Sequence, residues 1–501
     1  MNHRLLITLA LLSPLAALAA PARPPNLIWI MADDLGYGDL GSYGQKVIST
    51  PHLDRMAQEG LRFTQFYAGA TVCAPSRSVL MTGRHHGRTR VRGNAGTVNP
   101  AAQALREGDT TVAGALQAAG YATALIGKWG LGDVGAAAGG LPRRHGFGYF
   151  FGFLNQTHAH NHFPDFLWRN EDRISLPNKV TPVGSVPGAG YATDAVLFAD
   201  DLFTDEALKF VSNHQQRPFF LYWSMIIPHA NNERTRELKN GAHVPDFGPY
   251  AGKDWPEPDK GQAAMITRMD SYVGRMLAQL RQLGLAENTL VIFTSDNGPH
   301  NESNHDLSRF EPSGALNGIK RSLTDGGIRV PALAWWPGTV KPGSVIGAPV
   351  SSPDFFPTLL EAAGAKPAPG QILDGVSLVP VLRGGAAPER AIFWQYPHYG
   401  NQGGAPAAAV RRGPWKLIHW FEDDRFELFN VVADLGEATD LAAREPARVV
   451  ALRTELAAWQ RTVGAKFPTA NPTYDDTKPN GRASIRPGSP EANTQKAKSK
   501  K

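Results

Sequence analysis

Four short apolar segments, each followed at once by polar residues, constrain the fold of this chain more than any other feature of its sequence. They are residues 26–31 (NLIWIM), 122–126 (ATALI), 219–226 (FFLYWSMI) and 289–294 (TLVIFT). Uninterrupted apolar runs of this length are typical of strands that are buried on both faces. Between them, apolar residues recur at helical spacing in residues 53–59, 111–119 and 265–283. This alternation predicts an α/β fold with a large, mostly parallel sheet flanked by helices.

The residues that follow the four segments carry the chemistry of a predicted site. The segments run into Asp33-Asp34, Gly127-Lys128, Pro228-His229 and Asp296-Asn297. Open α/β sheets bind ligands at the carboxyl ends of their strands, so we expect these side chains to share one site. The carboxylates and the amide offer hard oxygen ligands, which suit Ca²⁺ or Mg²⁺ rather than a softer metal. A turn or helix cap is the alternative interpretation of the first acidic pair.

Cys73 is the only cysteine in the 501 residues, so it can form no disulfide within the chain. The stretch CAPSRSVLMTG, residues 73–83, predicts a helix that opens at the cysteine, with Pro75 in its first turn. A helix N-terminus favours bound anions and lowers the pKa of a thiol, and Arg77 adds a cation one turn along. A lone cysteine is more often an inert packed residue, but its neighbours favour a functional role here.

The stretch CAPSR followed by SVLMTG resembles the signature of the type I sulfatases, C-x-P-S-R with a downstream T-G. Residues 120–129, GYATALIGKW, resemble a second signature of that family. Further similar landmarks occur in order at Asp33-Asp34, Pro228-His229, residues 295–298 (SDNG), 317–320 (NGIK) and 326–331 (GGIRVP). The resemblance spans about residues 25–445 and implies the alkaline-phosphatase-like α/β fold and hydrolysis of sulfate monoesters.

The resemblance also implies the nucleophile and the metal. In the family the signature cysteine is oxidised to formylglycine, whose hydrated aldehyde attacks sulfur and whose second hydroxyl then expels sulfate. Cys73 would therefore be a precursor that a formylglycine-generating enzyme converts during maturation. The implied metal is Ca²⁺, with Mg²⁺ a weaker candidate. Its implied ligands are Asp33, Asp34, Asp296 and Asn297, together with the converted residue at Cys73.

The remaining implied roles fall on basic side chains. Arg77 would stabilise the formylglycine hydrate, with Asp296 as the proton acceptor. Lys128 and Lys320 would neutralise charge on the sulfate oxygens, and His229 would protonate the departing sugar or aryl oxygen. The substrate would be a sulfated carbohydrate or an aryl sulfate.

One departure from the family pattern concerns Gly130. Many members read G-K-W-H-L-G, and their histidine helps to break down the sulfated intermediate; this chain reads GKWGLG. The glycine form with a downstream AHN segment resembles a branch that acts on carbohydrate sulfates, which implies a galactose or N-acetylgalactosamine type of sugar. We expect His160 or His300 to lie near the sulfate or the substrate, with loop histidines on a polar rim as the alternative.

Two other functions remain open at this point. A phosphate or phosphonate ester hydrolase could use the same fold and metal, because phosphate has a similar shape. A non-catalytic relative that binds sulfated glycans is conceivable because of Gly130. The nucleophile, metal and lysine positions argue against the second alternative.

The ends of the chain suggest its domain organisation. Residues 1–20 have the basic start, apolar run and small residues of a signal peptide, which predicts an exported protein, periplasmic or secreted. Residues 21–375 would form the catalytic domain, and 376–465 a smaller antiparallel sheet with strands at 391–396, 415–420 and 426–431 and a helix at 446–462. No later apolar run is long enough for a transmembrane segment.

Residues 466–501 form a predicted disordered tail that is basic. Its last 24 residues contain seven basic residues and one acidic residue, which accounts for the whole net charge of +6. Because the rest of the chain is neutral, we expect no nucleic-acid partner, although the tail could weakly attract a polyanion.

Overall fold

The computed structural model describes residues 23–94, 100–402, 404–472 and 474–475. The predicted signal peptide lies outside these ranges, as does the part of the predicted basic tail from residue 476 onward. Within the described part of the chain, no helix combines the length and the apolar character that a membrane span requires.

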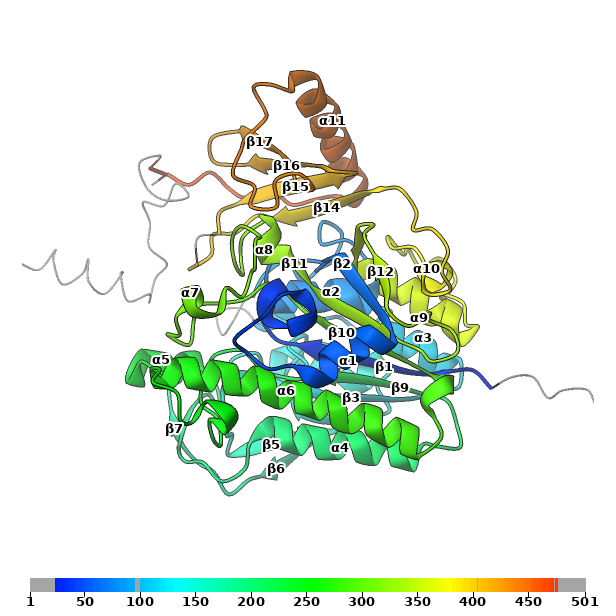
Figure 1. The fold of residues 1–501 in the computed structure, drawn as a ribbon, viewed down its shortest axis with the longest axis vertical. Helices are drawn as coiled ribbons and strands as arrows, with labels where there is room; N and C mark the ends of the chain where they lie inside the picture. Colours follow the sequence, from blue (N-terminus) through cyan, green and yellow to red (C-terminus); the bar gives the residue numbers. More distant parts are fainter. Residues whose placement is uncertain (1–22, 95–99, 403, 473, 476–501) are drawn as a thin grey trace, which may run out of the picture.

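A large sheet forms the centre of the molecule (Figure 1). Its strands are β1 (Asn26–Ala32), β2 (Leu61–Tyr67), β3 (Ala122–Lys128), β4 (Tyr149–Phe153), β5 (Phe166–Arg169), β6 (Asp172–Ser175), β9 (Phe219–Ser224), β10 (Thr289–Ser295), β11 (Arg329–Trp335), β12 (Ser344–Ile346) and β13 (Val350–Ser351). They lie in the order β12-β2-β11-β10-β1-β9-β3-β4-β5-β6, with β13 paired to β2. The neighbours from β10 to β4 run parallel, whereas β11 and β5 are antiparallel to the strands beside them. The predicted mostly parallel sheet is confirmed.

Helices cover both faces of this sheet, because alternate strand residues point to opposite sides. In β1, Ile28 and Ile30 belong to one apolar core, and Leu27 and Trp29 belong to the other. The first core includes residues of α1 (Pro51–Glu59), α4 (Ala199–Asn213) and α6 (Glu257–Gln282). The second includes residues of α2 (Cys73–Thr82), α3 (Val112–Ala118), α9 (Phe355–Ala363) and α10 (Val379–Leu382). Smaller elements are β7 (Lys179–Pro182), β8 (Gly190–Asp194), α5 (Asn232–Leu238), α7 (Leu307–Phe310) and α8 (Asp325–Ile328).

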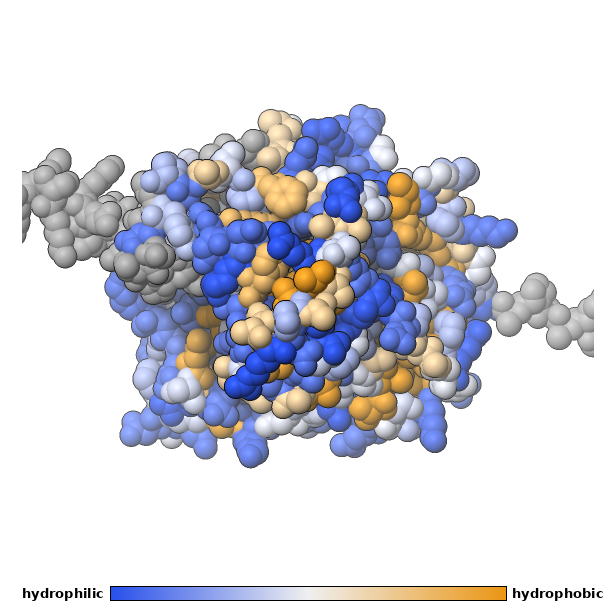
Figure 2. Space-filling model, turned by 90° about the horizontal axis from the view of Figure 1, so that it is seen from above, coloured by the Kyte–Doolittle hydropathy of each residue, from blue (hydrophilic) through white to orange (hydrophobic). Residues whose placement is uncertain are grey.

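The C-terminal unit is a second, antiparallel sheet with one helix packed on it (Figure 1). Its elements are β14 (Ala391–Tyr396), β15 (Ala407–Arg412), β16 (Trp415–Trp420), β17 (Arg425–Asn430) and α11 (Pro446–Val463). One face of the sheet packs against α11, and the other packs against Val72 and Ile328 of the main unit. The outer end of this unit mixes hydrophilic and apolar side chains (Figure 2). The predicted antiparallel sheet and helix are thus confirmed, and one face of that sheet packs directly behind Cys73.

Candidate active site

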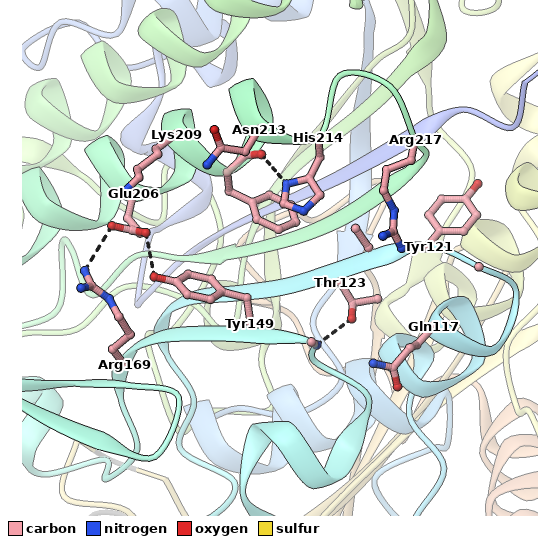
Figure 3. A pocket seen from close by; sticks show the side chains of 14 residues that line it. Gln117, Tyr121, Thr123, Tyr149, Arg169, Glu206, Lys209, Asn213, His214 and Arg217 are labelled. Atoms are coloured by element: carbon pink, nitrogen blue, oxygen red, sulfur yellow. Dashed lines mark hydrogen bonds and ion pairs between the residues drawn. The ribbon is translucent and has the colours of Figure 1, made fainter.

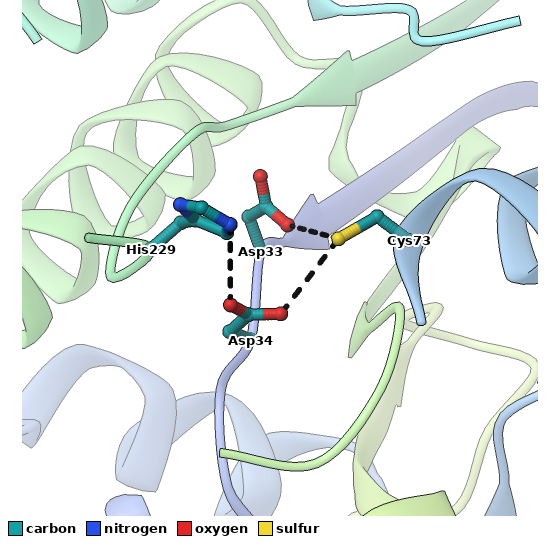
Figure 4. A group of neighbouring side chains, drawn as sticks. All are labelled: Asp33, Asp34, Cys73 and His229. Atoms are coloured by element: carbon teal, nitrogen blue, oxygen red, sulfur yellow. Dashed lines mark hydrogen bonds and ion pairs between the residues drawn. The ribbon is translucent and has the colours of Figure 1, made fainter. Parts of the chain in front are cut away.

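The carboxyl edge of the large sheet gathers the polar residues that the sequence places after its strands. Asp33 and Asp34 follow β1, Lys128 ends β3, and His229 and Asp296 lie just beyond β9 and β10. Cys73 is the first residue of α2, and its side chain faces the two aspartates (Figure 4). All of these side chains are almost fully buried, so they form an enclosed site.

An oxygen-rich group surrounds the thiol. The Sγ atom of Cys73 lies 3.4 Å from Oδ1 of Asp33 and 3.8 Å from Oδ1 of Asp34. Asp34 has a left-handed backbone conformation (φ 66°), and its N–H donates to Oδ1 of Asp296 at 3.1 Å. The amide of Asn297 donates to Oδ1 of Asp34 at 2.6 Å, while its own Oδ1 is buried with no hydrogen-bond partner among the described residues. The two residues after β1 and the two after β10 therefore converge on one place. Oδ1 of Asn297 remains there without a hydrogen-bond partner among the described residues.

Three cations lie against these carboxylates. Nε of Arg77 donates to Asp296 at 2.9 Å, and its Nη1 donates to the hydroxyl of Ser224. Lys128 is ion-paired with Asp33, and Nζ of Lys320 lies 2.6 Å from Oδ2 of Asp34. Buried charges are stable only when they are paired in this way. The three cations balance the three carboxylates, and a cation bound by these carboxylates would leave Arg77, Lys128 and Lys320 free to receive a tetrahedral anion.

The pKa values in the site follow from burial and from these neighbours. Burial opposes ionisation of Asp33, but Lys128, His229 and Arg77 hold the pKa of its carboxyl well below the usual range. Burial, reinforced by Asp33, raises the pKa of Asp296 to about 7. Burial also raises the pKa of the Cys73 thiol, so the lowered thiol pKa predicted from its position at a helix N-terminus is wrong. Desolvation outweighs the helix dipole there, and a protonated thiol is a poor nucleophile.

His229 presents one ring nitrogen to the site. Its Nδ1 contacts the carbonyl oxygen of Ala230 at 2.7 Å, and its Nε2 lies 3.2 Å from Nζ of Lys320 and 3.5 Å from Asp34. Burial and the nearby Lys320 charge keep the pKa of His229 well below its ordinary value. The ring of His160 stacks on His229 with centroids 4.8 Å apart. The structure therefore places His160 beside His229, and its position near a substrate stays a prediction.

His300 also lies beside His229, but its ring has other partners. Its Nε2 contacts the carbonyl oxygen of Pro228 at 3.0 Å, and its Nδ1 accepts the N–H of Glu302 at 2.8 Å. Because both nitrogens are engaged with the backbone, neither is available to a substrate atom in this arrangement. His300 holds the loop in place instead.

Glu302 and Arg321 belong to the site but were not predicted from the sequence. The Glu302 carboxylate lies 3.1 Å from Nζ of Lys320 and 3.2 Å from Nη1 of Arg321, and it is 4.0 Å from Nε2 of His229. Glu302 lies in a loop with no periodic pattern, and Arg321 directly follows a motif residue. No local sequence signal distinguishes them from surface charges.

A cavity of about 640 Å³ lies at the opposite edge of the sheet, at the amino ends of β3 and β4. Tyr149 and Arg169 contact Glu206 within it, and Lys209 and Arg217 lie on its wall (Figure 3). It contains none of the residues at the carboxyl edge, so the chemistry described above lies elsewhere.

Known proteins with similar sequences and structures share this arrangement of units. A family model described as Sulfatase matches residues 25–365, and one described as N-sulphoglucosamine sulphohydrolase, C-terminal, matches residues 319–461. Arylsulfatase A of Homo sapiens is 37% identical over 438 residues, which cover 82% of this chain and 78% of the relative. N-acetylgalactosamine-6-sulfatase of Canis lupus familiaris is 33% identical over 444 residues, covering 85% and 78%.

A solved structure of a 6S-sulf protein, from work on glycosaminoglycan metabolism by Bacteroides thetaiotaomicron, has a similar fold. It has a TM-score of 0.72 and 26% identity, and the match covers 88% of this chain and 100% of that chain. The Sulfatase match alone spans well over half of the chain and includes every residue of the site described above. The chain therefore belongs to the sulfatase family, whose members hydrolyse sulfate esters.

Proposed function

We propose that this sulfatase removes sulfate from carbohydrates, with formylglycine formed from Cys73 as its nucleophile and Ca²⁺ as its metal. The observation that carries the proposal is the position of Sγ of Cys73. It lies 3.4 Å from Asp33, at the start of a helix, and three buried cations surround the same carboxylates. A reacting group there faces both a metal-binding oxygen set and a pocket suited to sulfate.

The donor set fits a hard divalent cation. Asp33, Asp34, Asp296 and Asn297 offer oxygen atoms, which Ca²⁺ and Mg²⁺ prefer. The buried Oδ1 of Asn297 has no partner within the described residues, and a cation between the carboxylates would satisfy it. Ca²⁺ is favoured over Mg²⁺ because it tolerates irregular, all-protein coordination. The bound metal would polarise a sulfate oxygen and acidify the nucleophilic hydroxyl.

The chain's own side chains supply the other requirements. Conversion of Cys73 would provide a hydroxyl nucleophile whose geminal partner can release sulfate. Arg77 is held by Asp296 and Ser224, so its charge is fixed next to residue 73. Lys128 and Lys320 would turn from their carboxylate partners to the sulfate oxygens. Asp296, which accepts from Nε of Arg77 at 2.9 Å beside residue 73, would accept the proton of the attacking hydroxyl.

His229 and His160 would act on the side of the leaving group. Nε2 of His229 faces the cluster and accepts from Lys320 in the free protein. Once Lys320 turns to the negatively charged sulfate, the ring can take up a proton on Nε2 and donate it to the departing oxygen. Nδ1 of His160 contacts Glu233 at 2.9 Å, which orients its ring against His229 and directs Nε2 away from Glu233. We assign His160 to substrate binding and His300 to positioning of the loop.

A carbohydrate substrate is supported by the sequence branch and by the relatives named above. The GKWGLG stretch resembles carbohydrate-specific members, and a relative at 33% identity is an N-acetylgalactosamine-6-sulfatase. Export to the periplasm or beyond is proposed from the signal-peptide pattern of residues 1–20. A polymeric sulfated carbohydrate would be met in that compartment.

Turnover of competing substrates distinguishes sulfate hydrolysis from phosphate hydrolysis and from glycan binding without catalysis. The purified protein is given 4-nitrophenyl sulfate and 4-nitrophenyl phosphate together, then a panel of galactose and N-acetylgalactosamine monosulfates. We expect sulfate release from the aryl sulfate and from at least one sugar, with kcat/KM for phosphate at least tenfold lower. A preference for phosphate would support the phosphate or phosphonate hydrolase, and binding without turnover would support the glycan-binding alternative.

A further inference from the structure

Glu302 is a fourth buried carboxylate in the site and is separate from the proposed metal ligands. Its side chain is only 7% exposed. Its backbone is fixed on both sides, because its N–H donates to His300 at 2.8 Å and its carbonyl accepts from Thr235 at 2.7 Å. The carboxylate is therefore held rigidly 4.0 Å from the ring nitrogen of His229 that faces the leaving group.

The two oxygens of Glu302 have different partners. Oε1 contacts Nη1 of Arg321 at 3.2 Å and Nδ2 of Asn401 at 3.4 Å. Oε2 contacts Nζ of Lys320 at 3.1 Å. A carboxylate has about four acceptor positions, so these three donors leave room for one more.

Binding of sulfate by Lys320 can remove the hydrogen bond that Oε2 of Glu302 accepts. Nζ of Lys320 contacts Asp34, Glu302 and His229, which accounts for all three of its N–H groups. Lys320 can contact a sulfate oxygen only by giving up at least one of these partners. When it gives up Glu302, Oε2 loses its only donor among the described side chains and stays buried.

We propose that Glu302 is a specificity-determining residue that accepts a hydrogen bond from a sugar hydroxyl beside the sulfate ester. This inference rests on the proposed action on carbohydrate sulfates. The position suits it: Oε2 lies 4.0 Å from the nitrogen that would protonate the ester oxygen, so the sugar hydroxyl nearest to the ester, C4–OH in the case of a 6-sulfate, falls within its reach. The substrate hydroxyl then replaces Lys320 as the donor to Oε2.

The same geometry explains which substrates are rejected. A sugar without that hydroxyl leaves a buried carboxylate oxygen unsatisfied, which costs more than an ordinary lost hydrogen bond. A second sulfate at that position brings a negative charge against Glu302 and has no proton to donate. The site therefore selects sugars with one sulfate next to a free hydroxyl and discriminates against vicinal disulfates.

The hydrogen bond between Glu302 and the sugar hydroxyl is tested by a double-mutant-type cycle, in which one change is made in the enzyme and the other in the substrate. The panel first identifies the galactose or N-acetylgalactosamine monosulfate that the wild type turns over fastest. Analogues of that sugar, each lacking one hydroxyl near the sulfate (the hydroxyl at C4 for a 6-sulfate, or one on a neighbouring ring carbon for a ring sulfate), are then compared in the wild type and in Glu302→Ala. Because general damage to Lys320 or to folding affects both substrates of a variant, it cancels in the ratio of their kcat/KM values.

We expect loss of one hydroxyl to lower kcat/KM of the wild type at least about tenfold and that of Glu302→Ala less than about twofold. Glu302→Gln keeps the shape of the side chain and one acceptor oxygen, so an intermediate ratio is expected. Asp259→Asn is the matched control. Asp259 is a buried carboxylate that holds the same loop through Asp306 and Arg309 but lies outside the site. This variant should keep the full wild-type ratio.

Three results would overturn the proposal. They are a wild type that is indifferent to every flanking hydroxyl, an unchanged ratio in Glu302→Ala, and a ratio that falls equally in Asp259→Asn. If the protein cleaves aryl sulfate but no sugar of the panel, the carbohydrate proposal fails together with this one. The first three failures leave the carbohydrate proposal intact.

Discussion

The backbone at Gly130 disfavours a residue with a side chain, such as the histidine of the GKWHLG form. Gly130 has φ 72°, a left-handed conformation that residues with side chains adopt at a cost, and a Cβ atom would lie 2.8 Å from Oε1 of Gln156. The stacked pair of His160 and His229 places another imidazole at the site from a different loop. The absent side chain thus goes together with a left-handed backbone at this position.

Introducing the family histidine at position 130 should therefore not increase sulfatase activity. We expect Gly130→His to lose about 1–2 kcal/mol of unfolding free energy and to turn over 4-nitrophenyl sulfate no faster than the wild type. Urea unfolding and initial rates measure the two effects. A faster variant of unchanged stability would contradict the account of Gly130.

Asn297 provides the residue-scale test of the metal. Its unpartnered Oδ1 is assigned to the cation, so Asn297→Ala should bind Ca²⁺ at least about tenfold more weakly. The measurement is the rise in melting temperature as Ca²⁺ is added to chelator-treated protein, which does not depend on activity. Equal Ca²⁺ dependence in the variant and the wild type would exclude Asn297 as a ligand.

At the scale of elements, the loop that carries Lys320 is anchored by a buried charge network. Asp325 begins α8, five residues after Lys320, and its carboxylate lies 2.8 Å from Nζ of Lys416 on β16. Lys416 also contacts Glu437 at 2.9 Å, and its side chain is fully buried. The C-terminal unit therefore helps to hold the loop of Lys320 in place.

Removing the cation of this network should be costly. We expect Lys416→Met to lose about 3–5 kcal/mol of unfolding free energy, because Lys416 is the cation that Asp325 and Glu437 share and two buried carboxylates would then face each other without it. Arg412→Ala breaks the exposed ion pair with Glu455 on the same unit and should cost at most about 1 kcal/mol. Similar denaturation midpoints for Lys416→Met and the wild type would show that the contacts of Lys416 with Asp325 and Glu437 do not stabilise the packing of the C-terminal unit against the main unit.

The elements differ in how well the sequence predicts them. The four apolar runs predict β1, β3, β9 and β10, because continuous burial leaves a continuous apolar pattern. β15, with the sequence AAAVRR, was not predicted, since its alanines carry no strand preference and its place depends on β14 and β16. The first two turns of α6, from Glu257, were also missed, because EPDKGQ is polar and carries no apolar residue at helical spacing.

The residues of the candidate site also differ in how well the sequence predicts them. Residues after strands could be predicted to converge, because parallel strands bring their ends to one edge. Glu302 could not, because its place depends on contacts with His300, Thr235 and Arg321 that are distant in the sequence or without a local pattern. The pKa of Cys73 was predicted in the wrong direction for a similar reason: the depth of burial depends on the whole fold.

At the scale of the whole molecule, many histidines are buried in the uncharged form. Burial lowers the pKa of His86, His158 and His305 to about 3 and that of His162 to about 4. In the unfolded chain these groups titrate near 6.5, so below that pH the unfolded state binds more protons. Stability should therefore fall as the pH drops from about 6.5 toward 3, and these histidines add nothing to the pH dependence above that range.

His158 allows this pH dependence to be tested at one position. Its ring lies between Phe153 and Phe166, and its Nε2 has no hydrogen-bond partner among the described residues. His158→Phe removes the titration and keeps an aromatic ring. Between pH 6.5 and 4, its unfolding free energy should fall less steeply than that of the wild type, by up to about 1.4 kcal/mol per pH unit. Parallel pH profiles would exclude a contribution from His158.

The state of residue 73 is central to the whole account. Protein purified from its native host is digested with trypsin, and the peptide of residues 63–77 is examined by mass spectrometry with an aldehyde-reactive probe. The account predicts that the thiol of Cys73 is replaced by an aldehyde that reacts with the probe, and that a Cys73→Ala protein lacks sulfatase activity. An unmodified thiol at full occupancy in active enzyme would contradict it.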